Sequence, residues 1–303
     1  MLTTEFLNLT FPNPLVLASG IRGVSASSMQ LMVKNGCGGV TLKSVSLNAR
    51  VGHENPTIVT EHFYLLNAIG LSNPGVAAIN EEIAKFKTNN HTTPLIASIF
   101  AGNAADLLKT ALAVDLDKID LLEINLSCPN VGSEFGEPFA YSPNAVATIT
   151  KQLKQHIKVP ISIKLSPQAW NIATIAKAAE DNGADAITAV NTISGMAIDI
   201  NVAKPILQNL TGGISGPALF PLALRCVYEI YRAVKIPIIG TGGITTGQEA
   251  IAMLMAGATL LGIGSAVYYR GINVFAKINR EIEEFMRQNK VHSLAELIGK
   301  AHQ

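Results

Sequence analysis

The 303-residue sequence predicts an α/β fold: a (β/α)8 or TIM barrel with long loops at the carboxyl ends of its strands. One unit repeats eight times, a short apolar run that ends in a polar residue or glycine, followed by a helix-like segment. Strands that alternate with helices pair in parallel through crossovers, and eight such units can close into a barrel. The predicted strands are residues 14–19, 39–44, 95–98, 120–125, 160–164, 186–191, 236–240 and 260–265.

The turns before the strands support these boundaries. Glycine follows a helix-like segment at Gly36, Gly183 and Gly257, where it can adopt the left-handed conformation that ends a helix. Proline introduces other strands, at Pro94 and Pro160, where a first strand position needs no backbone donor. Helix, turn and strand therefore follow one another in the order that a barrel requires.

No shift in composition divides the chain, so we expect one domain over residues 1–303. Three insertions, residues 45–78, 127–142 and 193–217, are longer than simple connections. Active sites of such barrels are built from the loops at the carboxyl ends of the strands. We therefore expect these insertions to lie over that face and to serve function.

Bulk composition excludes several classes of function. With 48% hydrophobic and 15% charged residues, the chain can bury a large core, and its net charge of +1 argues against nucleic-acid binding. Three scattered cysteines, Cys37, Cys128 and Cys226, form neither a disulfide framework nor a metal motif. We expect a cytoplasmic protein, because this cysteine usage fits a reducing compartment and the amino terminus lacks the pattern of a signal peptide.

Residues 250–269 contain no charge and are long enough to cross a bilayer. Glycine and other small polar residues interrupt this stretch, however. It fits equally a helix, a turn and a buried parallel strand, which is normally apolar throughout. We favour this second interpretation and expect no membrane segment.

Three glycine-rich groups occur at residues 212–217, 240–243 and 262–265. Each alone is an ordinary turn signal. Residues 240–243 and 262–265 end the last two strands, where barrels often bind phosphate because backbone N–H groups can face an anion, and residues 212–217 precede the helix that leads into the seventh strand. The sequence therefore predicts a ligand that carries phosphate.

Two lysines, Lys43 and Lys164, end predicted strands. A lysine that points into the mouth of a barrel is costly unless it faces an anion or polar ligand. The alternative is an ion pair with a neighbouring carboxylate such as Glu123. Two such lysines beside a phosphate site favour a cofactor with a phosphate and a ring that gains negative charge.

Amide side chains also gather in the loops and at the strand ends. Asn67, Asn125, Asn130 and Asn191 each offer two donors and one acceptor, and Thr192 follows the last of them. This chemistry suits a flat heterocycle with alternating N–H and C=O groups. Turn or capping roles are the alternative for single members, although two of them directly end buried strands.

Cys128 follows the fourth strand, within residues 125–130. A thiol at this position can act as a nucleophile or general base, since its reference pKa of about 8.5 can be tuned towards neutrality. The alternative is a buried structural cysteine, which is our interpretation of Cys37 and Cys226. No histidine is well placed as a partner, so a Cys/His hydrolase is poorly supported.

Taken together, these motifs resemble the catalytic subunit of dihydroorotate dehydrogenase, a flavin mononucleotide (FMN) enzyme of pyrimidine synthesis, over essentially the whole chain. The resemblance rests on several stretches in order. They are Thr41-Leu42-Lys43-Ser44, residues 67–75 and 125–130, Lys164-Leu165-Ser166-Pro167, Asn191-Thr192, residues 212–217, Thr241-Gly242-Gly243 and Gly264-Ser265.

The resemblance implies that Cys128 removes a proton from C5 of dihydroorotate while a hydride passes from C6 to flavin N5. Serine takes this role in the membrane-bound class, so cysteine indicates class 1. The implied substrate-binding residues are Lys43, Asn67, Ala68, Ile69, Gly70, Leu71, Asn125, Asn191 and Thr192. The implied FMN-binding residues are Ser19, Lys43, Ser44, Asn125, Lys164, Val190, Gly216, Gly242, Gly243, Gly264 and Ser265. No metal site is implied.

Residues 191–199 and the loop 132–143 resemble the NAD-linked class 1B type. That type works with a second subunit that carries FAD and a 2Fe–2S cluster, so we expect a homodimer or a heterotetramer with this iron–sulfur flavoprotein. Two departures stand out: Ser98 replaces an asparagine that contacts FMN in many relatives, and residues 20–24 differ from the bacterial 1B pattern. The alternatives are a fumarate-linked class 1A homodimer and a non-catalytic barrel that binds flavin or phosphate.

Overall fold

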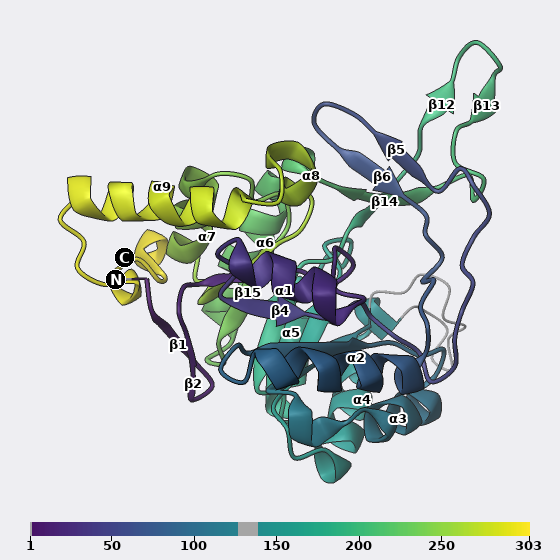
Figure 1. Cartoon of the computed structure of the whole chain (residues 1–303), viewed down its shortest axis with the longest axis horizontal. Coiled ribbons are helices and arrows are strands. Elements are labelled where there is room, and N and C mark those ends of the chain that lie inside the picture. Colours follow the sequence, from purple (N-terminus) through teal and green to yellow (C-terminus); the bar gives the residue numbers. More distant parts are fainter. Residues whose placement is uncertain (1, 127–138) are drawn as a thin grey trace.

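The computed structural model describes residues 2–126 and 139–303 and contains a closed barrel of eight parallel strands (Figure 1). Each strand overlaps a run predicted from the sequence and extends at most one residue beyond it, so the prediction of a (β/α)8 barrel is confirmed. Nearly every residue of these strands is buried, as expected for parallel strands covered by helices. In order around the barrel they are β10 (Ala186–Ala189), β15 (Ile238–Thr241), β16 (Leu260–Ile263), β3 (Leu15–Leu17), β4 (Gly39–Thr41), β7 (Leu95–Ile99), β8 (Leu121–Asn125) and β9 (Ile161–Leu165).

The helices cover the outside of the barrel and begin and end at the signals that the sequence provides. A capping box between Thr246 and Glu249 starts one helix, and the predicted left-handed glycines Gly36, Gly183 and Gly257 follow the ends of three helices, one of them this same helix. The helices are α1 (Ala26–Lys34), α2 (Val76–Asn89), α3 (Ala104–Ala113), α4 (Pro143–His156), α5 (Ile172–Asp181), α6 (Phe220–Ala233), α7 (Gly247–Met255), α8 (Ala266–Arg270) and α9 (Val274–Gln288).

A short hairpin covers the amino-terminal end of the barrel. Strands β1 (Thr4–Phe6) and β2 (Leu9–Phe11) pair antiparallel, and the rings of Phe6 and Phe11 meet edge to face with centroids 6.1 Å apart. Both rings pack into a buried cluster with residues from the beginnings of the barrel strands, among them Val16 and Leu260. This end of the barrel is therefore closed by apolar packing, which leaves the carboxyl end for chemistry.

Two of the three predicted insertions form one antiparallel sheet. Its strands, in spatial order, are β11 (Ile193–Gly195), β14 (Gly212–Ser215), β6 (Leu65–Asn67) and β5 (Ile58–Thr60). A small hairpin, β12 (Ile198–Asp199) and β13 (Lys204–Pro205), projects beyond this sheet, on the opposite side of the molecule from the two termini (Figure 1). The insertions expected to be loops thus partly form a sheet. This sheet brings Asn67 and Gly213, which are 146 residues apart in the sequence, into contact.

The uncharged stretch 250–269 folds as the helix, turn and strand that the sequence favours: the end of α7, a turn at Gly257, β16 and the start of α8. Within the described part of the chain, no helix combines the length and apolar character needed to cross a bilayer.

Candidate active site at the carboxyl end of the barrel

A buried ion pair joins two neighbouring strands near the carboxyl end of the barrel. Lys164 on β9 places its Nζ 3.4 Å from Oε1 of Glu123 on β8, and the hydroxyl of Ser98 on β7 donates to the same oxygen at 2.8 Å. The three residues are only 6%, 2% and 1% exposed. They meet because the strands pair in register, Ser98 opposite Glu123. The ion pair considered from the sequence therefore exists and forms the floor of the site.

A chain of serine hydroxyls rises from this floor. The Oγ atoms of Ser98 and Ser44 are 2.8 Å apart, and those of Ser44 and Ser19 are 3.1 Å apart. The backbone N–H of Ser44 also donates to Ser19 Oγ at 3.1 Å. Ser98, whose role the sequence left open, thus bridges the buried carboxylate and the residues predicted to bind the cofactor.

The predicted amides join the same network. Asn125, the last residue of β8, donates from Nδ2 to Ser44 Oγ at 3.3 Å, and Asn191 donates from Nδ2 to Asn125 Oδ1 at 3.3 Å. The backbone N–H of Thr192 in turn donates to Asn191 Oδ1 at 2.9 Å. The structure therefore brings together four predicted residues from three separate segments of the chain.

Asn67 reaches this group through the antiparallel sheet. Its Nδ2 donates to the carbonyl of Gly213 at 3.1 Å, and a Cβ added to Gly213 would lie 2.7 Å from Cβ of Thr192. Asn67 and Thr192 therefore flank the same glycine. The absence of a side chain at Gly213 allows β14 to pass between them.

The predicted residues Ala68–Leu71 form a braced loop after β6. The carbonyl of Gly70 accepts from Nε of Arg50 at 2.9 Å, and the carbonyl of Ile69 accepts from the backbone N–H of His53 at 3.2 Å. Nδ1 of His53 lies 3.1 Å from the carbonyl of Ala68. These contacts were not foreseen from the sequence. Within the described residues, no hydrogen bond joins this loop to the side chain of Lys43.

The glycine-rich groups converge at the other side of the barrel mouth. A Cβ at Gly243 would lie 2.6 Å from the backbone N of Phe220 and 2.8 Å from the carbonyl O of Gly216, so two of the groups are in direct backbone contact. Both glycines have positive φ, 74° and 94°. A side chain there would be strained and would also clash, which explains the requirement for glycine.

Next to these turns, Gly264 and Ser265 line a cavity of about 350 Å³ together with Ile21 and Arg22. A Cβ at Gly264 would have no neighbour closer than 3.5 Å, so this position is open rather than crowded. Val190, another predicted cofactor residue, donates its backbone N–H to the carbonyl of Thr241 at 2.7 Å, which places it beside Gly242.

Lys43 carries the second positive charge of the site. Burial lowers its pKa, and the nearby ammonium group of Lys164 lowers it further. In the part of the chain that the structure describes, Lys43 makes no ion pair, whereas Lys164 is paired with Glu123. Among the described residues, the ammonium group of Lys43 thus lies near that of Lys164 with no carboxylate of its own, and the site therefore favours a ligand with negative charge.

Cys128 and the rest of residues 127–138 lie outside the described residues, as does most of the loop 132–143. The other two cysteines are inert: burial raises the pKa of Cys37 to about 12 and that of Cys226 to about 11. Their structural interpretation fits these environments. Among the described residues, no three His, Cys, Asp or Glu side chains gather in a way that could hold a metal ion.

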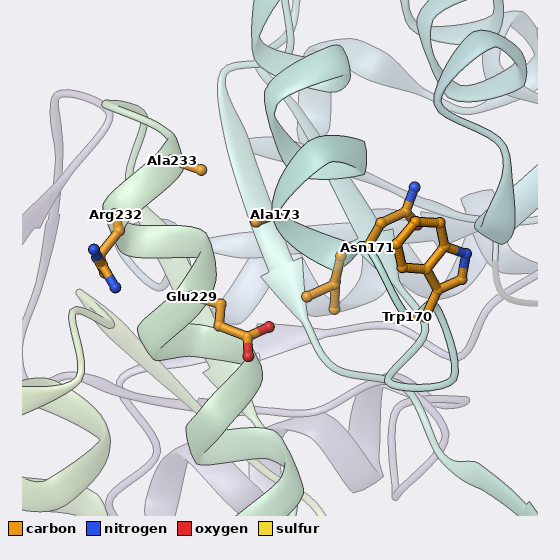
Figure 2. Close-up of a pocket in the computed structure, with 7 residues that line it drawn as sticks. Trp170, Asn171, Ala173, Glu229, Arg232 and Ala233 are labelled. Carbon is orange, nitrogen blue, oxygen red and sulfur yellow. The ribbon is translucent and has the colours of Figure 1, made fainter.

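A second hollow, of about 370 Å³, lies between the beginning of α5 and the end of α6 (Figure 2). Trp170 and Asn171 flank it on one side and Glu229 and Arg232 on the other. It contains none of the residues predicted from the sequence. The predicted residues that lie within the described part belong instead to the barrel mouth and the sheet above it.

A closed parallel barrel with lysines, amides and glycine turns at its carboxyl end is the arrangement of a barrel enzyme that binds a small anionic ligand. The model of the family described as dihydroorotate dehydrogenase matches residues 1–286, and the chain belongs to this family.

Archaeal relatives match along the whole chain. A protein from Methanothermobacter thermautotrophicus is 42% identical over 303 residues, covering 100% of this chain and 99% of the relative. One from Methanocaldococcus jannaschii is 40% identical, covering 100% and 99%. One from Pyrococcus abyssi is 41% identical, covering 99% of each chain. All three are named dihydroorotate dehydrogenase B (NAD(+)), catalytic subunit.

Proposed function

We propose that the chain oxidises (S)-dihydroorotate to orotate in pyrimidine biosynthesis, as the FMN-binding catalytic subunit of an NAD-linked enzyme. The observation that carries the proposal is the convergence of Asn67, Asn125, Asn191 and Thr192 beside two lysines, in a chain of this family. Amide donors and acceptors suit the alternating N–H and C=O groups of the orotate ring, and an ammonium group suits its carboxylate.

The residues present fit FMN. Gly216, Gly242, Gly243, Gly264 and Ser265 would hold its phosphate, since their turns are in mutual contact or open onto the cavity beside β16. Ser19, Lys43, Ser44, Asn125, Lys164 and Val190 would hold the flavin ring, because they surround the polar floor of the barrel mouth. When bound, FMN accepts the hydride that leaves C6 of the substrate.

The chain itself would bind, orient and deprotonate the substrate. Lys43, Asn67, Asn125, Asn191 and Thr192 orient its ring and carboxylate, and the loop Ala68–Leu71 covers it from the sheet above. Cys128 would remove the proton from C5 as a general base. Part of the loop 132–143 would close over the bound substrate and exclude water.

Electrons would leave through a partner subunit. The relatives are named as catalytic subunits, which implies such a partner. We propose a subunit with FAD and a 2Fe–2S cluster that passes electrons to NAD, in a heterotetramer built on a homodimer of this chain. A fumarate-linked homodimer of class 1A is the competing form, and the archaeal names favour the NAD-linked one.

The test compares electron acceptors for the purified, FMN-loaded chain. With dihydroorotate, an artificial dye should be reduced rapidly, whereas NAD and fumarate should be reduced poorly. Adding the co-purified iron–sulfur subunit should restore reduction of NAD. Rapid fumarate turnover by the chain alone would contradict the NAD-linked form, and the absence of dye reduction would contradict the activity itself.

Replacing Lys43 by methionine should stabilise the ligand-free chain and weaken orotate binding. A lysine with a lowered pKa binds its proton less tightly in the folded state than in the unfolded state, so the charged group opposes folding below that pKa. Removing it raises Tm, while loss of a charged hydrogen bond should weaken orotate binding by about 10- to 150-fold. Calorimetric titration and thermal unfolding measure the two effects.

The control for this variant is Lys151→Met, on the exposed face of α4, which should change neither quantity. If the Lys43→Met variant were less stable than wild type, or bound orotate as tightly as wild type, Lys43 would not be a buried charge that opposes folding and binds the ligand.

A further inference from the structure

The buried carboxylate of Glu123 is not used by the reaction as described, yet it lies at the root of the whole network. It is 2% exposed and accepts hydrogen bonds from Ser98 and Lys164 on the two neighbouring strands. An ionised carboxylate can only accept hydrogen bonds. Every group that forms a hydrogen bond with Glu123 must therefore be the donor.

This requirement fixes the direction of each following bond. Ser98 has one hydroxyl hydrogen, which goes to Glu123, so its oxygen must accept from Ser44. The hydrogen of Ser44 is thereby committed, and its oxygen must accept from Ser19 and from Nδ2 of Asn125. Ser19 then donates to Ser44 and accepts from the backbone N–H of the same residue.

The direction continues into the amides. Because Nδ2 of Asn125 faces Ser44, its Oδ1 faces Asn191 and accepts from Nδ2 of that residue. Oδ1 of Asn191 accepts from the backbone N–H of Thr192. Neither amide can rotate by 180° without placing two donors or two acceptors face to face.

We propose that Glu123 is a positioning residue, which acts through Ser98 and Ser44 to fix the donor and acceptor pattern that Ser19, Asn125 and Asn191 present to flavin and substrate. Its second effect is to balance the charge of Lys164 beside the ring. The inference rests on the proposed function, since it takes FMN and orotate as the ligands. In this arrangement Ser98 does not contact the cofactor directly: it donates to Glu123 and therefore accepts from Ser44, which sets the donor and acceptor roles of the residues beyond it.

The test uses three variants of the full chain. Ser98→Ala interrupts the series of hydrogen-bonded hydroxyls and keeps the ion pair. Glu123→Gln removes the negative charge, and its side-chain amide can donate as well as accept, so the hydroxyls are no longer forced to donate towards residue 123. The control is Ser162→Ala on β9, whose Oγ is 2.8 Å from Thr188 Oγ1. This hydroxyl is also fully buried, and Ser162 pairs in register with Glu123, but it takes no part in the network.

Four quantities are measured for each variant: Tm, the dissociation constant of FMN by fluorescence quenching, the visible spectrum of the bound flavin and its midpoint potential. Ser98→Ala should weaken FMN binding about threefold to tenfold, the effect of one hydrogen bond, and alter the spectrum. Glu123→Gln should in addition raise the potential, because an unbalanced Lys164 favours the reduced, more negative flavin. Ser162→Ala should lower Tm alone.

Wild-type values of FMN affinity and potential in Ser98→Ala and Glu123→Gln would overturn the inference, as would equal changes in Ser162→Ala. If Glu123→Gln does not fold, the FMN affinities and flavin spectra of Ser98→Ala and Ser162→Ala still test the inference. A wild-type chain that binds no FMN would overturn the proposed function and the inference with it. A wild type that binds FMN, with unaffected variants, would overturn the inference alone.

Discussion

Replacing Cys128 by alanine is expected to leave a folded chain that binds FMN but whose flavin is reduced by dihydroorotate about 10²- to 10⁴-fold more slowly. The loss is that of a general base, because the C5 proton must then pass to water or to a poorly placed group. Anaerobic stopped-flow absorbance, which follows bleaching of the yellow flavin, measures this half-reaction without any electron acceptor.

The control is Cys226→Ala, which removes a thiol that is buried in α6 and whose pKa burial raises to about 11. This variant should bleach at the wild-type rate. Near-normal bleaching in Cys128→Ala would show that another group removes the proton, and loss of bound FMN in that variant would show that Cys128 acts through binding instead.

Replacing Lys164 by methionine is expected to destabilise the ligand-free chain by about 3–5 kcal/mol. The substitution leaves the carboxylate of Glu123 in the barrel interior without its ion-pair partner, and an uncompensated buried charge is costly. The measurement is urea denaturation of the apoprotein. The double variant Lys164→Met with Glu123→Gln should recover part of the loss, because it removes the stranded charge.

Lys154→Met provides a matched comparison. Lys154 and Asp185 form an ion pair with a distance of 2.7 Å, shorter than that of Lys164 and Glu123, but their side chains are 25% and 31% exposed. Breaking a pair that water can reach should cost only about 0–1 kcal/mol. Equal losses in the two single variants would contradict the account of a desolvated pair at the floor of the site.

The barrel could be predicted from the sequence because its strands are buried on both faces. Runs such as residues 14–19 and 236–240 are therefore continuously apolar up to a polar or glycine end, and glycines such as Gly183 mark where the preceding helices stop. Local sequence determines these features, so they are visible without the rest of the chain.

The antiparallel sheet and the amino-terminal hairpin were not foreseen. Asn67 pairs with Gly213 on β14, 146 residues later, and a local sequence pattern does not indicate which distant strand will be the partner. The hairpin has strands of only three residues, and its turn consists of Leu7 and Asn8, both with positive φ. An asparagine there is a weak signal of a two-residue hairpin turn and could have indicated it.

For the candidate site, the sequence supplied the residues but not their pairing. It identified Lys164 as either an anion-binding group or the partner of Glu123, and the structure shows the ion pair at the base of the proposed flavin site. The role of Ser98 could not be predicted, because it depends on the register between β7 and β8, which places its hydroxyl on Glu123.

The central claim is that this barrel binds FMN and transfers to it a hydride from dihydroorotate. The most direct measurement is an anaerobic titration of the FMN-loaded wild-type chain with dihydroorotate, followed by flavin absorbance, with orotate identified in the product. The account predicts complete bleaching near one equivalent of substrate and formation of orotate. A flavin that stays yellow in excess dihydroorotate, or a chain that retains no FMN, would contradict it.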